Sequence, residues 1–100
     1  MNELNMAVNN YRNLLNSCRT LLNQLNNAKN NIEDCKNIGS YYSVEDVAFG
    51  FDDIVSVSND LSNSISNIRD KVIPSIEQKI RKLNVHIEQL REEEMQANSQ

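Results

Sequence analysis

The sequence has no tryptophan, one proline and two glycines among its 100 residues. Because glycine and proline form most sharp turns, their scarcity limits the chain to a few long elements in one domain. No apolar run approaches the roughly 18 residues that a membrane-spanning helix requires. The first residues also lack the basic and apolar segments of a secretory signal. We therefore expect a cytoplasmic protein without a membrane span.

Groups that support catalysis or nucleic-acid binding are also scarce. The net charge of −4 argues against a nucleic-acid partner, which normally requires a basic surface. His86 is the only histidine, and no glycine-rich loop is present that would hold a phosphate. We predict a protein that is not an enzyme and that binds no metal or cofactor.

The two cysteines, Cys18 and Cys35, stand 17 positions apart in a segment predicted to be one helix. A helix of that length separates them by about 25 Å, which is too far for a disulfide. Small buried side chains and a bridge to another chain are the remaining alternatives.

A long heptad repeat occupies the first part of the chain. Its apolar residues alternate at steps of four and three, with Lys29 in the one gap: Leu4, Val8, Tyr11, Leu15, Cys18, Leu22, Leu25 and Ile32. This spacing is typical of a helix that packs against another helix, and we call such a row the seam. A second row, one position before the seam, is also apolar: Ala7, Leu14, Leu21, Ala28 and Cys35. The wider face favours a three- or four-helix environment.

A second seam follows, interrupted only at Ser58. It consists of Val44, Val47, Phe51, Ile54, Leu61, Ile65, Ile68 and Val72. We predict an all-α, elongated antiparallel helical hairpin that fills residues 1–100 as a single domain. Its expected parts are a helix over 2–37, a turn over 38–43, a helix over 44–73, a kink at Pro74 and a helix over 75–95. Pro74 removes one helical hydrogen bond, and the apolar spacing slips there to two successive steps of four, from Val72 through Ile76 to Ile80.

The relative lengths of these helices predict an overhanging C-terminal arm. A helix over 2–37 spans about 54 Å, so a second helix counted from Val44 reaches its far end near residue 79. The arm beyond either folds back at Pro74 or is covered by another chain, and we favour the second. The predicted partner-binding residues are Leu15, Leu22, Leu25, Ile80, Leu83, Ile87 and Leu90.

The predicted tip of the hairpin, residues 39–53, holds four of the five aromatic residues: Tyr41, Tyr42, Phe49 and Phe51. Phe51 belongs to the seam. Phe49 and Asp53 fall on the outward face, one helical turn apart. They form either a docking element or, if Phe49 packs on the tyrosines, a seal over the turn.

In length, in its two long helices and in its short turn, the chain resembles the small helical hairpins of type VII secretion, the WXG superfamily in its broad sense. Tyr41 with Glu45, and Tyr42 with Asp46, read as YxxxD/E. Phe49 with Asp53 reads as FxxxD, similar to a motif in the small helical partners of LXG toxins of Gram-positive bacteria. The family's Trp-x-Gly turn is missing, and residues 95–100 contain no export motif. The resemblance is therefore closest to those small partners, which act as targeting chaperones.

The resemblance implies a non-enzymatic adaptor that binds the helical N-terminal domain of a toxin, or a second small hairpin protein, and helps present the toxin for export. The recognition tip would comprise Tyr41, Tyr42, Glu45, Asp46, Phe49 and Asp53. A homodimer, and co-secretion with the partner without a cleaved signal peptide, are compatible with it. The seams fit two other functions equally well. One is a self-assembling homomeric coiled coil of the phage, filament or needle type, and the other is an antitoxin-like inhibitor.

Overall fold

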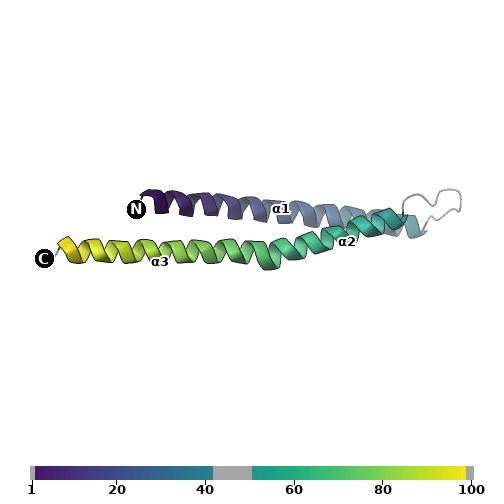
Figure 1. Cartoon of the computed structure of the whole chain (residues 1–100). Helices are drawn as coiled ribbons and strands as arrows, with labels where there is room; N and C mark the ends of the chain where they lie inside the picture. The colour runs from purple at the N-terminus through teal and green to yellow at the C-terminus, as the bar shows by residue number, and fades with distance from the viewer. Residues whose placement is uncertain (1, 42–50, 99–100) are drawn as a thin grey trace.

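The computed structural model describes residues 2–41 and 51–98, with the side chains of 2–35 and 53–98. These residues form α1 (Asn2–Tyr41), α2 (Phe51–Asn67), a short π-helical segment η2 (Ile68–Val72) and α3 (Ile73–Asn98). α2, η2 and α3 join end to end into one long rod that runs antiparallel to α1 (Figure 1). The molecule measures 85 × 16 × 15 Å. This confirms the all-α, elongated helical hairpin.

The helix boundaries differ from the predicted ones. α1 continues to Tyr41 and includes Gly39, which lies in the turn predicted over 38–43. A glycine inside a helix costs only about 1 kcal/mol, and 40 residues of helix tolerate that cost. The predicted start of the second helix, at residue 44, lies outside the described residues, among which α2 begins at Phe51.

The two seams form the interface between the rods. Of the most buried apolar side chains, Val8, Leu15 and Ile65 belong to the two seams, and Ile76 and Ile87 continue the second seam beyond Pro74. The other described seam residues are mostly half-buried. No described side chain falls below 2% exposure, because in a pair of helices each seam residue is covered from one side only.

The kink predicted at Pro74 is present, and it takes the form of a π-helical turn just before the proline. The backbone N–H of Ile73 donates to the carbonyl oxygen of Ile68, five residues earlier. Proline lacks an N–H and its ring clashes with the carbonyl four residues before it, here that of Asp70. The wider π turn accommodates both effects. The rod bends where α2 meets α3 (Figure 1).

The π turn adds one residue and thereby corrects the predicted seam. Val72, predicted to be buried, is 42% exposed, and Ile73 is half-buried in its place. The predicted slip of two steps of four is therefore wrong. After one step of five, the alternation of three and four resumes through Ile73, Ile76, Ile80, Leu83, Ile87 and Leu90.

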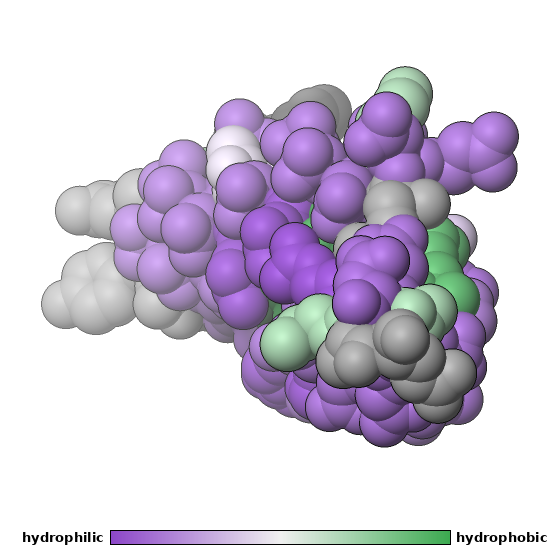
Figure 2. Space-filling model, turned by 90° about the vertical axis from the view of Figure 1, so that its left-hand side faces the viewer, coloured by the Kyte–Doolittle hydropathy of each residue, from purple (hydrophilic) through white to green (hydrophobic). Residues whose placement is uncertain are grey.

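The C-terminal overhang is shorter than predicted. Ile87 is only 6% exposed, and Ile80, Leu83 and Leu90 are half-buried where α3 contacts α1. The prediction that these four residues extend beyond α1 is therefore wrong. Residues 91–98 are all exposed and would span about 12 Å; the C-terminus lies beyond the N-terminus (Figure 1). From this end, hydrophilic residues cover most of the surface (Figure 2).

Candidate protein-binding surfaces

The predicted partner-binding residues lie along the interface between the two rods. Leu15 and Ile87 are buried there. The others are half-buried along the same interface: Leu22, Leu25, Ile80, Leu83 and Leu90. Binding of a partner by these residues stays a prediction. A partner that docks on the closed hairpin would mainly contact the positions beside them.

One side of the hairpin carries exposed apolar residues, each of which directly precedes a seam residue in the sequence. Leu14 and Leu21 are 47% and 44% exposed. Val57 and Val72 occupy the same position before seam residues of the opposite rod and are 46% and 42% exposed. We define the apolar face as these four residues together with Ala7, Ala28 and Cys35. On α1 it extends over about 42 Å.

The opposite side of the hairpin is polar. It carries charged residues among many asparagines, and we call it the charged side. Arg19 and Glu77 each follow a seam residue, and their Nη2 and Oε2 atoms lie 3.6 Å apart. The positions after the seam on both rods therefore meet on one side, and the positions before it, including the apolar face, lie on the other. Both side chains are more than one-third exposed, so the pair contributes only tenths of a kcal/mol.

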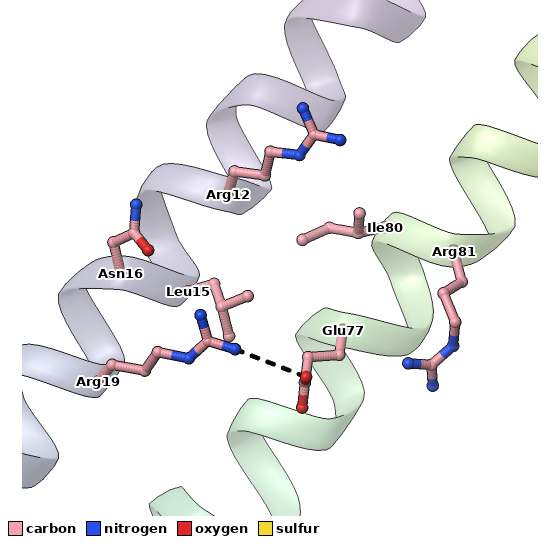
Figure 3. Close-up of a pocket in the computed structure, with 7 residues that line it drawn as sticks. All are labelled: Arg12, Leu15, Asn16, Arg19, Glu77, Ile80 and Arg81. Atoms are coloured by element: carbon pink, nitrogen blue, oxygen red, sulfur yellow. Dashed lines mark ion pairs between the residues drawn. The ribbon is translucent and has the colours of Figure 1, made fainter.

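A shallow groove of about 400 Å³ lies on this charged side. We call it the arginine groove (Figure 3). It is lined by Arg12, Leu15, Asn16 and Arg19 of α1 and by Glu77, Ile80 and Arg81 of α3. Leu15 is buried and Ile80 half-buried between the helices, and the longer polar side chains extend around them (Figure 3). The groove thus combines an apolar centre with a positively charged rim.

Ser58, the interruption in the second seam, forms a buried polar layer. It is 3% exposed, and its Oγ donates to Oε1 of Glu33 at 2.5 Å. Ser62 Oγ donates in turn to the carbonyl oxygen of Ser58 at 3.0 Å. Ser58 is buried and Glu33 is half-buried, and a polar pair of this kind in the seam favours the alignment in which the two side chains meet.

Arg69 and Asp70 form a bidentate pair on the surface of η2. The Nε–Oδ1 and Nη2–Oδ2 distances are 2.8 and 3.0 Å. This hydrogen bonding lowers the pKa of Asp70 and raises that of Arg69. Both groups are exposed and adjacent in sequence, so the pair is a local feature of the π turn.

Most of the predicted recognition tip lies outside the described side chains. α1 ends at Tyr41, and of the six tip residues only the side chain of Asp53 is described, as exposed. The tip stays a prediction.

Other candidate groups are scattered along the hairpin. Cys18 is half-buried, Cys35 is exposed, and both are free thiols. His86 is exposed. Over residues 2–41 and 51–98 no group of three or more His, Cys, Asp or Glu side chains could hold a metal ion. No helix in these ranges has the length and apolar character that crossing a membrane requires.

No protein-family model, curated protein or solved structure matches this chain. The resemblance to the small hairpins of type VII secretion therefore rests on the residues quoted above and on the general architecture.

Proposed function

We propose that this chain is a non-enzymatic helical adaptor that binds a helical segment of another protein along its apolar face. The observation that supports this is the row of half-exposed apolar side chains on α1, with Leu14 and Leu21 at its centre. A row repeated every seven residues beside an occupied seam is a surface that a further helix can cover.

The total surface of the chain supports the same proposal. The accessible surface is 7753 Å², whereas a compact folded chain of this size exposes about 5,800 Å². The excess of about 2,000 Å² is comparable with the share that one partner contributes to a permanent complex, roughly 1,000–2,500 Å².

The resemblance to the small partners of LXG toxins suggests the cargo. We propose that the bound segment is the helical N-terminal domain of a type VII secretion effector, and that the adaptor acts as its targeting chaperone. Residues of the tip, with Phe49 and Asp53 at their centre, would then contribute to recognition by the secretion machinery.

The binding energy at the apolar face can be estimated from its two leucines. Full burial of a leucine contributes about 1.5–3 kcal/mol, so covering the exposed half of Leu14 or Leu21 contributes about 1 kcal/mol. A glutamate at either position would place a charge in the dry centre of the contact, at a cost of several kcal/mol. The substitution should therefore weaken binding by far more than tenfold.

The test is an affinity capture of the tagged protein from its native cells, with Leu21→Glu beside a matched control, Gln24→Glu. Both positions are exposed on α1, and both substitutions add one negative charge. We expect the original chain and the control to recover a large protein with a helical N-terminal domain in stoichiometric amount. Leu21→Glu should lose it.

Two results of this experiment would contradict the proposal. Recovery of the chain alone as a large homo-oligomer would indicate a self-assembling structural protein. Recovery of a partner through its catalytic domain would indicate an inhibitor. Export is tested separately with Phe49→Ala, which should leave the complex intact and reduce secretion of the partner.

A further inference from the structure

The arginine groove is lined by three arginine side chains and by one carboxylate, that of Glu77. Among the described residues, only Arg19 of the three arginines forms an ion pair, with the carboxylate of Glu77. Arg12 and Arg81 form no ion pair within the part of the chain that the structure describes. The whole chain nevertheless has a net charge of −4. Two unpaired guanidinium groups beside an apolar centre favour a carboxylate-bearing segment as the occupant.

A segment with the complementary charge is present in the same sequence. Glu92, Glu93 and Glu94 are consecutive and exposed near the C-terminal end of α3. We call them the acidic end. Three carboxylates close to a helix C-terminus repel both one another and the helix dipole. A cationic surface that covers them would remove this unfavourable interaction.

The acidic end of a chain cannot reach the groove of the same chain. Arg81 and Glu92 both lie on α3, which is one continuous helix from Ile73 to Asn98. Eleven residues of helix separate them by about 16 Å along the axis. The groove and the acidic end can therefore meet only between two molecules.

We propose that two copies of this chain associate through the ends of α3, with the acidic end of each copy bound in the arginine groove of the other. The two α3 helices then cross antiparallel, and the twofold axis passes midway between Arg81 and Glu92, near His86 and Ile87. Val85, which is 57% exposed, lies on the same face of α3 as Arg81 and Glu92, because helical positions four and seven residues apart share a face. It supplies an apolar contact close to the axis.

This dimer has a distinctive shape. The contact is isologous, so it closes at two copies and does not extend into a filament. The copies overlap only along the end of α3, over about 30 Å. A molecule 85 Å long therefore forms a dimer of about 140 Å. Side-by-side packing of two copies on their apolar faces would keep the length near that of one copy.

The dimer is independent of the proposed adaptor function. The groove lies on the charged side of the hairpin, and the apolar face lies on the other. Leu21→Glu should leave the dimer intact, whereas charge reversal in the groove should leave partner binding intact. The failure of one proposal is thus distinguishable from the failure of the other.

The experiment is sedimentation equilibrium and small-angle X-ray scattering on the full chain with two charge-reversed variants. The groove variant carries Arg12→Glu and Arg81→Glu, and the acidic-end variant carries Glu92→Arg and Glu93→Arg. All four side chains are exposed, so both variants should fold, as circular dichroism would show. The control is Arg69→Glu with Lys71→Glu, which changes the net charge as the groove variant does, on the exposed surface of η2.

We expect the original chain and the control to dimerise, with a maximum dimension of about 140 Å. The Kd should rise at least tenfold between 0.05 and 0.5 M salt, because salt screens exposed charges. Each charge-reversed variant alone should be monomeric. An equimolar mixture of the two should form a dimer again, because the reversed groove then meets the reversed end and the two original surfaces meet each other.

Three results would overturn the proposal. The first is a chain that stays monomeric at several hundred micromolar in low salt. The second is a dimer that neither salt nor charge reversal weakens. The third is a mixture of the two variants that remains monomeric.

Discussion

The π turn before Pro74 leads to a sharp prediction about two neighbouring residues. An uninterrupted heptad pattern places Val72 in the seam, whereas the structure exposes Val72 and places Ile73 there. Ile73→Ala should therefore destabilise the fold more than Val72→Ala does, whereas the uninterrupted pattern predicts the reverse.

The magnitudes follow from the exposure of the two side chains. Truncation of a buried isoleucine to alanine costs about 2–5 kcal/mol, so a half-buried one should cost about 1–2 kcal/mol. Val72→Ala removes little buried area, and alanine is a better helix former than valine by about 0.5 kcal/mol. Its free energy of unfolding should therefore change by less than about 0.5 kcal/mol in either direction.

The assay is urea unfolding followed by circular dichroism at 222 nm, at low micromolar protein and 0.5 M salt so that any charge-dependent association is suppressed. The two variants serve as controls for each other, since each shortens one adjacent apolar side chain in the same turn. A larger loss of stability for Val72→Ala than for Ile73→Ala would refute the π-turn register. The continuous heptad seam would then be the better description.

Three further predictions concern other parts of the hairpin. Ser58→Ala removes the hydroxyl that donates to Glu33. It should lower the free energy of unfolding, measured by urea titration, by about 1–3 kcal/mol. An unchanged free energy of unfolding would show that this hydrogen bond does not stabilise the fold. Leu83→Glu should unfold the isolated hairpin, because Leu83 is half-buried against α1; a fully helical, equally stable variant by circular dichroism would place Leu83 outside the core. The pKa of Asp70 is lowered in the folded chain, so its interaction with Arg69 stabilises the fold above the unfolded pKa and is lost as the pH falls through the folded pKa. An NMR titration should show the Asp70 carboxylate titrating at lower pH than in the Arg69→Ala variant, and equal titration in both would contradict the pair.

The hairpin itself was predictable because two heptad seams define two helices that must cover each other. The alignment of the helices was not predictable, because a heptad pattern looks the same after any shift of seven residues. Counting from Val44 placed residue 79 beside the start of the first helix. The structure instead pairs Glu77 with Arg19, whose Oε2 and Nη2 atoms lie 3.6 Å apart, so Glu77 lies well inside the length of α1 and not close to its start. The predicted overhang of Ile80 to Leu90 followed from that alignment.

The π turn could not be predicted from the sequence, for a different reason. Both Val72 and Ile73 are β-branched apolar residues, so the sequence offers two candidates for one seam position and no sign of which is buried. Pro74 indicated a disturbance at this site, but whether a helix kinks or widens depends on the packing of the turns that follow. The seam from Ile76 onward fits α1 only if one residue is inserted before it.

The seam residues pack against one another within the chain. A partner must therefore be recognised mainly by the positions that flank the seam. The row before the seam is apolar, and Leu14 and Leu21 give it the character of a surface that excludes water. The row after the seam is polar, and the charged residues Arg12 and Arg19 lie on it one heptad apart. Two surfaces of opposite chemistry on opposite sides of one rod can be occupied at the same time. A complex of two hairpins joined at α3, each with its own helical partner, is therefore sterically consistent with both proposals, and its stoichiometry of two to two can be measured directly by native mass spectrometry.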